Sequence, residues 1–284
     1  MVAEGDKEKV SLGTIQETMI VPLWARAIEQ QQEEPILRDR MSAAIMERLD
    51  YHIEPKGVMP YLQVRLSVRG RLLDDFVLEF LGEHPRGCVI EIGCGLSTRF
   101  HRIDNGEVNW VCVDLPDLMQ LREKLIDPHE RLTNIKDSIF EHGWIDQVKK
   151  IGGPYMIVIE GLLPYFDKNQ VTRIFKTVSD EFDGSRIAFD TQTELYRKLV
   201  KPGKLITAED GESGLSFKWT VKQIEEIEQM EGRLHLRDTR TLPELPKKQY
   251  HRLTFKTRLL ETASCLFWGR YRVNVFDILG FKSP

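Results

Sequence analysis

One short segment, residues 88–98, constrains the fold of this chain more than any other. The apolar run at residues 88–92 contains one acidic residue, Glu91, and ends at Gly93 and Gly95. An apolar run of this length is typical of a buried strand. Glycines one residue apart allow a tight turn and let a ligand approach the backbone where a Cβ atom would clash. The segment therefore predicts a strand that leads into a ligand-binding turn, as in α/β folds.

A second strand with an acidic end follows this turn. Residues 108–113 are strand-like, and Asp114 comes directly after them, about twenty residues beyond the glycines. An acidic residue at this point suits the two hydroxyl groups of a ribose. Together the two features predict a nucleoside-containing cofactor. The alternative is an ordinary strand–turn–helix corner without a ligand, because short motifs give false matches.

The kind of cofactor depends on two positions around the turn. The dinucleotide-binding motif reads G-x-G-x-x-G, and Thr98 occupies its third glycine position here. Glu91, two residues before the turn, suits a cationic ligand better than a diphosphate. S-adenosylmethionine carries a sulfonium and an ammonium group and no phosphate, so we expect this cofactor. A nicotinamide-dependent oxidoreductase and a non-catalytic nucleoside-binding regulator are the alternatives.

Size and charge exclude several classes of protein. The chain has 284 residues, which fit one large α/β domain or two small ones. Its net charge of −4 provides no attraction to nucleic acid or to an anionic membrane. No apolar run approaches the ~20 residues that span a bilayer, and the first residues are polar. We expect a cytoplasmic protein that acts on a small molecule, and we leave its oligomeric state open.

The cysteines and histidines indicate neither disulfides nor a metal site. The four cysteines form no C-x-x-C pair, and Cys88, Cys94 and Cys112 lie in or beside predicted strands. Such cysteines are usually small buried hydrophobic residues. The seven histidines are scattered and lack the clustering that metal ligands require. We therefore expect a reducing environment and no metal.

Alternating strands and helices predict the arrangement of the sheet. Crossovers between short strands favour a parallel sheet with helices on both faces. The strands expected in it are residues 88–93, 108–115, 132–136, 156–160 and 186–190, separated by segments such as 118–126 and 168–182. Further along, residues 221–231 predict a charged helix. Residues 233–240 and 270–278 predict an antiparallel pair at the edge of the same sheet.

The expected fold class is therefore α/β, with a doubly wound, mostly parallel seven-stranded sheet and an antiparallel edge. An N-terminal helical extension precedes it, because residues 1–50 are mainly helical by pattern. Pro55 and Gly57 mark a loop, and residues 62–81 predict a long helix.

Six segments point to a particular family. They are residues 17–18, 26–27, 35–39, 69–76, 91–99 and 159–166. With the predicted strands, they resemble class I S-adenosylmethionine-dependent methyltransferases, which have a Rossmann-like sheet. More closely they resemble the leucine carboxyl methyltransferase family, and within it the tetracenomycin-type polyketide O-methyltransferases. The chain departs from many relatives at Ser97, where they have aspartate, and at Gly70, where threonine is common.

The resemblance implies a division of the chain and a reaction. Residues 1–60 would form a helical cap over the substrate, and residues 61–284 the S-adenosylmethionine-binding methyltransferase domain. A substrate-cap insertion is expected around residues 195–230. The implied activity is S-adenosylmethionine-dependent O-methylation of a carboxylate or phenolic hydroxyl on a small aromatic or polyketide-type acceptor.

The resemblance also implies where the cofactor binds. The implied residues are Arg69, Glu91, Gly93, Gly95, Asp114, Leu115, Asp137, Ser138, Glu160 and Gly161. The guanidinium of Arg69 is expected to grip the cofactor's carboxylate. Glu160 ends the fourth strand, where ligands of open sheets bind, and is expected to contact the cofactor's amino group. Asp114 is expected to accept hydrogen bonds from the ribose.

The other implied contacts are with the methionine part and the adenine of the cofactor. Glu91 and Gly93 are expected beneath the methionine part, with Glu91 acting on the ammonium group directly or through water. A carboxylate in an apolar strand is costly unless it is paired, which favours a functional role for Glu91. Asp137 and Ser138 are expected along the adenine; an ordinary turn is the alternative there, because both residue types are common in turns.

The acceptor side is less defined by the sequence. Tyr165 is expected to face the acceptor, with Trp24 and Tyr61 as further candidates. Additional aromatic candidates are Tyr196, Phe217 and Trp219. No histidine–carboxylate pair is evident, so His142 and His101 are single candidates for a base. A carboxylate acceptor needs none, because it is ionised near pH 7. We therefore favour catalysis by positioning alone.

Overall fold

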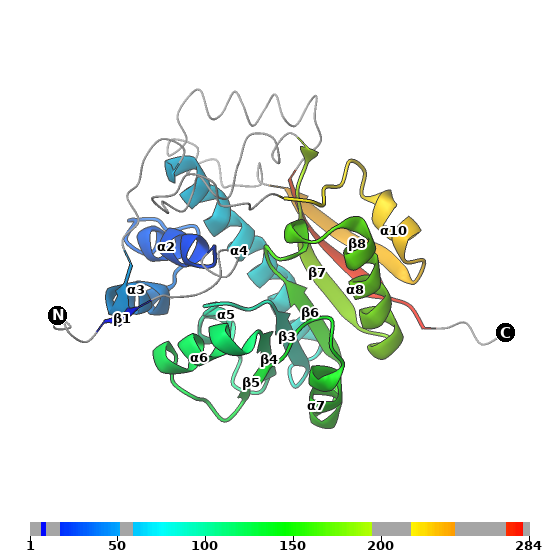
Figure 1. The fold of residues 1–284 in the computed structure, drawn as a ribbon, viewed down its shortest axis with the longest axis horizontal. Helices are drawn as coiled ribbons and strands as arrows, with labels where there is room; N and C mark the ends of the chain where they lie inside the picture. Colours follow the sequence, from blue (N-terminus) through cyan, green and yellow to red (C-terminus); the bar gives the residue numbers. More distant parts are fainter. Residues whose placement is uncertain (1–6, 10–17, 52–58, 195–216, 242–270, 281–284) are drawn as a thin grey trace.

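The computed structural model describes residues 7–9, 18–51, 59–194, 217–241 and 271–280, without the side chains of residues 59–61. Its main sheet has seven strands in the order β5-β4-β3-β6-β7-β9-β8 (Figure 1). The strands are β3 (Cys88–Ile92), β4 (Asn109–Asp114), β5 (Leu132–Lys136), β6 (Tyr155–Ile159), β7 (Arg186–Thr191), β8 (Leu234–Thr241) and β9 (Arg272–Ile278). The first five are parallel, and β9 runs antiparallel to both β7 and β8. This confirms the predicted fold class.

The helices predicted from the sequence pattern are present, and one of them is shorter than expected; those at residues 99–103 and 143–151 were not predicted. The helices are α2 (Ile20–Glu29), α3 (Arg40–Arg48), α4 (Met59–Glu83), α5 (Arg99–Ile103), α6 (Pro116–Leu125), α7 (Gly143–Ile151), α8 (Lys168–Glu181) and α10 (Glu225–Met230), with the 3₁₀ turn η1 (Leu163–Tyr165) and the short pair β1 (Glu8–Lys9) and β2 (Leu49–Asp50). The helix predicted over residues 221–231 is shorter than expected. Val221 instead donates its backbone N–H to the carbonyl of Gln192, which ties this segment to the end of β7.

Successive residues of each strand face opposite helical layers, so both faces of the sheet are apolar. In β3, Ile90 belongs to the same buried cluster as Trp144 of α7. Its neighbour Val89 belongs to a second cluster with Phe76 of α4. This alternation directs Glu91 toward the α4 side of the sheet, where α5 also lies.

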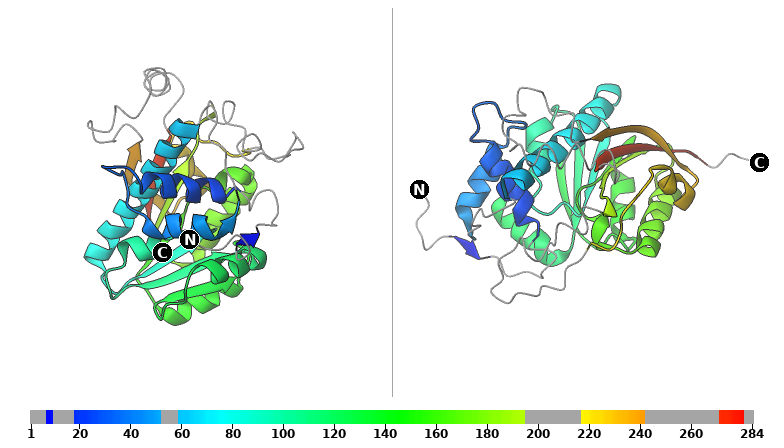
Figure 2. Two further views of the ribbon diagram at one scale, coloured as in Figure 1. Left: turned by 90° about the vertical axis from the view of Figure 1, so that its left-hand side faces the viewer. Right: turned by 90° about the horizontal axis from the view of Figure 1, so that it is seen from above.

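The N-terminal helices pack beside α4 at one side of the sheet (Figures 1 and 2). Val21 and Trp24 of α2 form a buried cluster with Leu62 and Leu66 of α4. Helix α4 begins at Met59, so it crosses the boundary predicted near residue 60. The division into a cap and a methyltransferase domain stays a prediction.

Three of the four cysteines lie in the described part of the chain. Cys88, Cys94 and Cys112 are buried free thiols, as expected for small hydrophobic residues. Burial raises the pKa of Cys88 to about 12, so this thiol stays protonated near neutral pH. Cys265 lies outside the described residues.

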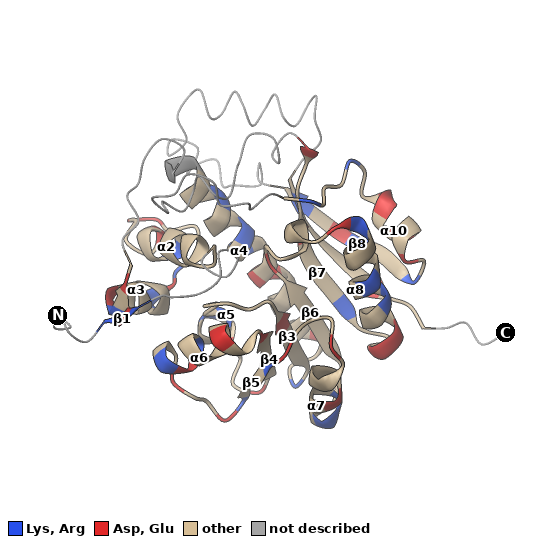
Figure 3. Ribbon diagram, in the orientation of Figure 1, with Lys and Arg blue, Asp and Glu red and all other residues tan. Residues whose placement is uncertain are grey.

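Charged residues of both signs lie close together along α4 and around α8 (Figure 3). On α4, for example, Arg71 pairs with Asp75 one turn later at 2.8 Å. None of the helices in the described ranges is both long and apolar enough to cross a bilayer.

The order of the strands fixes where a ligand binds. The chain builds β3, β4 and β5 toward one edge, and then β6 returns to the other side of β3. Ligands of open α/β sheets bind beyond the carboxyl ends of the strands at such a reversal. Here that point lies between Gly93, after β3, and Glu160, after β6.

Candidate cofactor site

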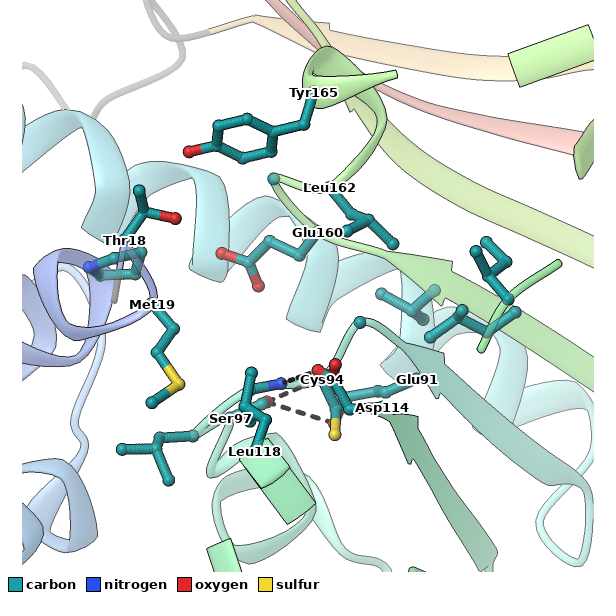
Figure 4. Close-up of a pocket in the computed structure, with 18 of the residues that line it drawn as sticks. Thr18, Met19, Glu91, Cys94, Ser97, Asp114, Leu118, Glu160, Leu162 and Tyr165 are labelled. Carbon is teal, nitrogen blue, oxygen red and sulfur yellow. Dashed lines mark hydrogen bonds between the residues drawn. The ribbon is translucent and has the colours of Figure 1, made fainter. Parts of the chain in front are cut away.

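A cavity of ≈ 390 Å³ lies at this reversal point, a volume within the usual range for small-molecule sites. Figure 4 shows Asp114 and Ser97 toward one end and Tyr165 toward the other, with Glu160 projecting between them. Thr18 and Met19, which precede α2, line the side nearest the N-terminal helices.

The cavity brings together the ten residues that the resemblance implies for the cofactor, and Tyr165 from the acceptor side. They are Arg69, Glu91, Gly93, Gly95, Asp114, Leu115, Asp137, Ser138, Glu160, Gly161 and Tyr165. They come from α4, from the ends of β3, β4, β5 and β6, and from η1, so only folding places them around one space. Their individual contacts with a ligand stay predictions.

The glycine turn after β3 has the backbone conformation that its sequence predicts. Gly93 and Gly95 have φ of +66° and +48°, which side chains rarely adopt. A Cβ atom on Gly93 would lie 2.6 Å from Cδ2 of Leu162. The space beside Gly93 is therefore filled by protein, whereas the sequence analysis left it to the ligand. Gly93 is needed for its φ and for packing.

Asp114 connects the end of β4 to this turn. Its Oδ2 accepts a hydrogen bond from the backbone N–H of Gly95 at 2.8 Å, and its Oδ1 accepts one from Leu115 at 2.8 Å. Burial raises the pKa of the Asp114 carboxyl group above its ordinary value. Each carboxylate oxygen has a further lone pair, so Asp114 keeps acceptor capacity toward the cavity.

A buried arginine beneath the cavity was missed by the sequence analysis. Arg99 begins α5, is fully buried, and donates to Asp74 at 2.7 Å, to Glu160 at 2.6 Å and to Glu91. Glu91 also accepts from the indole N–H of Trp110 at 3.1 Å. The carboxylate of Glu91 is thus paired within the protein. It holds Arg99 in place and forms part of the wall of the cavity.

The structure gives a reason for the serine at position 97, where many relatives have aspartate. Its hydroxyl donates to Glu91 Oε1 at 3.0 Å. An aspartate at this position would bring a second negative charge to Glu91. The change to serine is therefore consistent with the internal pairing of Glu91.

Glu160 is held ionised by two arginines. Its Oε1 accepts from Arg69 Nε at 2.8 Å, and Oε2 accepts from Arg99. Burial by itself would raise the pKa of Glu160, but the two arginines outweigh it and hold this pKa well below its usual range. A second nitrogen of Arg69, Nη1, lies 3.6 Å from Oδ2 of Asp190. A carboxylate in this state can attract a cation but is a poor base.

Helix α2 and the start of α3 add charged groups that the sequence analysis did not assign to the site. Arg26 lines the cavity, donates to Asp39 at 2.9 Å, and donates to the Leu96 carbonyl of the glycine turn at 3.1 Å. Thr98, which occupies the third glycine position of the dinucleotide motif, donates to Asp39 at 2.6 Å. The available signal was that Arg26 and Asp39 lie in segments that resemble the family; their charges alone give none, because charges on a helix usually face solvent.

Comparison with known proteins assigns the family. The leucine carboxyl methyltransferase family matches residues 19–179. The chain belongs to this family. It is 28% identical to the tetracenomycin polyketide synthesis O-methyltransferase TcmP of Streptomyces glaucescens, over 75% of this chain and 78% of TcmP. It is 26% identical to the S-adenosyl-L-methionine-dependent methyltransferase dpfgK of Gibberella zeae, over 78% of this chain and 80% of dpfgK.

A solved structure supports the same fold. A DUF574 family protein from Streptomyces avermitilis superposes with a TM-score of 0.56 and 13% sequence identity. The match covers 90% of this chain and 97% of that protein. At this level of identity the likeness concerns the fold alone.

The protein is thus an S-adenosylmethionine-dependent methyltransferase, and S-adenosylmethionine is its cofactor. The cavity of this family member fits that ligand chemically. Ionised Glu160 suits a positively charged ligand, and Asp114 suits a ribose. Asp137 and Ser138 lie beside the apolar residues Ile139 and Phe140, a surface suited to a flat adenine ring. When bound, the cofactor would supply a methyl group activated by its sulfonium.

Several acceptor-side expectations need correction. Trp24 lies outside the lining of the cavity, because it is buried in the cluster between α2 and α4. His142 is exposed just before α7, and His101 is exposed on α5; neither lines the cavity. Both are therefore poorly placed as a base.

Of the remaining aromatic candidates, one lines the cavity, one is buried elsewhere, and two cannot be placed. Phe217 lines the cavity and contacts Tyr165, with ring centroids 5.5 Å apart. Trp219 is buried in the cluster with α8. The side chain of Tyr61 and all of Tyr196 lie outside the described residues.

Proposed function

We propose that this methyltransferase transfers its methyl group to an oxygen atom of a small aromatic acceptor of polyketide type, a carboxylate or a phenolic hydroxyl. The name of TcmP supports an oxygen acceptor and a polyketide. The cavity supports an acceptor that arrives already ionised.

The state of the cavity's carboxylates carries this proposal. A base must be free to take a proton beside the acceptor, yet Glu160 is paired with Arg69 and Arg99, and Glu91 is paired with Arg99. The other two carboxylates among the described lining residues, Asp114 and Asp137, lie at the ends of β4 and β5, on the far side of β3 from Tyr165. Among the described residues that line the cavity there is no histidine. A carboxylate is ionised near pH 7, whereas an alkyl amine is protonated there, with a pKa of ~10 for lysine. An oxygen acceptor, and a carboxylate in particular, therefore suits this cavity best.

Binding and orientation are then the main tasks of the protein. We assign the cofactor's amino group to Glu160, its carboxylate to Arg69, its ribose to Asp114 and its adenine to Asp137 and Ser138. Gly93, Gly95, Leu115 and Gly161 would contact the cofactor through backbone or apolar surface. We assign the acceptor to the end of the cavity at Tyr165. Correct orientation alone contributes about 7–11 kcal/mol to such reactions.

Incubation with S-adenosylmethionine and matched panels of aromatic acids, phenols and benzylic amines tests the proposal. Mass spectrometry should show methylation of acids, and of phenols at higher pH. The single-turnover rate on an acid should be flat from about pH 6 to about pH 9. The His142→Ala control should keep both the activity and the pH profile.

Other outcomes would contradict the proposal. Methylation of benzylic amines alone would overturn the oxygen acceptor. Tight cofactor binding without turnover of any panel member would favour a regulatory protein. A rate that rises steeply with pH in the parent and is flat in His142→Ala would identify His142 as a base.

A further inference from the structure

A buried amide at the edge of the cavity lacks a partner. Gln192 directly follows β7, lines the cavity, and is only 5% exposed. Its side-chain oxygen Oε1 has no hydrogen-bond partner. Among the described residues that line the cavity, no other buried side-chain polar atom is in this state. Leaving such a group unpaired destabilises a folded protein, and buried polar groups are almost always paired. An unpaired amide beside a cavity therefore points to a ligand.

The sheet holds this residue firmly in place. Strand β7 lies inside the sheet, between β6 and β9. The carbonyl of Gln192 accepts a hydrogen bond from the Val221 N–H at 3.0 Å. The hydroxyl of the preceding Thr191 accepts one from Asn274 of β9 at 3.2 Å. The amide is thus presented by rigid structure, as binding groups of precise sites are.

The strand order places Gln192 on the acceptor side of the cavity. The cofactor residues lie at the ends of four neighbouring strands. Those expected along the adenine are at the end of β5, the one for the ribose at β4, those for the methionine part at β3, and the one for the amino group at β6. Gln192 follows β7, one strand farther in the same direction. Tyr165 and Phe217 line the same cavity as Gln192. The segment that follows Phe217 connects them, because Lys218 donates to the Pro164 carbonyl at 2.7 Å and Val221 to the Gln192 carbonyl.

We propose that Gln192 binds the methyl acceptor and selects acceptors that carry a hydroxyl group. This inference rests on the proposed function. The Oε1 atom is a hydrogen-bond acceptor, so its partner must bring an O–H or N–H group. An ionised carboxylate that receives the methyl group has no such hydrogen. The partner is therefore a second group on the aromatic acceptor, and a ring hydroxyl fits the polyketide class.

The Gln192→Met variant tests the proposal, because methionine has a similar shape and no amide. The probes are 6-hydroxy-2-naphthoate and 2-naphthoate, which differ by one hydroxyl group that lies too far from the carboxylate to bond to it. The variant should lose about tenfold or more in kcat/KM on the hydroxylated acid, mainly through KM. It should lose less than about threefold on 2-naphthoate. A Gln120→Met control, on the exposed face of α6, should match the parent.

Two readouts separate acceptor binding from other roles. The Kd of S-adenosylmethionine, measured by calorimetry, should stay within about twofold of the parent. The Tm of the ligand-free variant should be unchanged or higher, because an unpaired amide is replaced by an apolar group. A Tm lower by more than about 3 °C would make Gln192 structural and overturn the proposal. So would a cofactor Kd weakened about fivefold, or equal losses on both acids.

Failure of the proposed function is visible in the parent itself. If the parent binds the cofactor but neither methylates the two naphthoates nor binds them in the presence of S-adenosylhomocysteine, the aromatic acid class is wrong. The role of Gln192 for that class is then overturned too. If the parent methylates both acids equally well, the acceptor class stands and the selection by Gln192 is refuted.

Discussion

At the scale of the residue, single side chains serve both the protein and the ligand site. Asp114 is the clearest case, because its carboxylate accepts hydrogen bonds from Gly95 and Leu115 while it also lines the cavity. Arg99 is a second case, because it lies below the cavity yet pairs with both Glu91 and Glu160. A substitution at such a position changes the shape of the site as well as its contacts.

Substitution of Asp114 should separate these two effects. We expect Asp114→Ala to weaken S-adenosylmethionine binding about tenfold or more, because hydrogen bonds to a charged acceptor contribute about 1.5–3 kcal/mol each. Asp114→Asn keeps one oxygen for the Gly95 N–H and should retain more of the affinity. Calorimetry with the cofactor and with a 2′,3′-dideoxy analogue measures both. Equal losses for the two ligands would show that Asp114 acts on the turn and makes no contact with the ribose.

At the scale of the element, the first turn of α5 joins the glycine loop to the N-terminal helices. Thr98 precedes α5, and its hydroxyl donates to Asp39, which precedes α3. Arg102 of α5 donates to the same carboxylate at 2.9 Å. Helices far apart in the sequence are thus held together by one buried acidic group. The third position of the motif carries threonine where a dinucleotide-binding protein has glycine, and this contact gives the threonine a structural role.

Removal of the Thr98 hydroxyl should loosen this junction. We expect Thr98→Val, which keeps the shape of the side chain, to lower the free energy of unfolding by about 1–3 kcal/mol, because it removes a buried hydrogen bond. Urea unfolding measures the change. In the Thr172→Val control the lost hydrogen bond is a local one, from a partly exposed hydroxyl on α8 to the Lys168 carbonyl, so the effect should be within about 0.5 kcal/mol. Similar losses in both variants would rule out a special role for Thr98.

At the scale of the whole molecule, buried ion pairs tie the N-terminal helices, the glycine turn and the sheet together. Asp39 is 1% exposed and accepts from Arg26 and Arg102. Burial by itself would raise the pKa of Asp39, but the two arginines outweigh it and hold this pKa well below its usual range. The unfolded chain has an ordinary aspartate pKa near ~3.9. Asp39 therefore stabilises the fold above that value, and this stability is lost as the pH falls toward the folded pKa.

Acid should consequently unfold the protein in part through Asp39. We expect the free energy of unfolding of the parent, measured in urea, to fall between about pH 5 and pH 3. Asp39→Asn should be less stable at pH 7, by about 3–5 kcal/mol for a buried charge that loses its partner, and should depend less on pH in this range. Asp146→Asn, which changes an exposed residue of α7, should keep the parent's dependence. An unchanged pH dependence in Asp39→Asn would contradict this role.

The sequence by itself determined the features that depend on local patterns. The strands, most helices and the glycine turn followed from apolar periodicity and from the backbone freedom of Gly93 and Gly95, both of which are local properties. The candidate residues at the strand ends could be found because parallel strands bring their carboxyl ends to one edge. The tertiary structure alone decided which charges meet. Arg99 lies eight residues from Glu91 but 61 from Glu160, and no periodicity encodes such a contact. The same reason hid the placement of Gln192 beside the cavity and the burial of Trp24, since both depend on how separate elements pack.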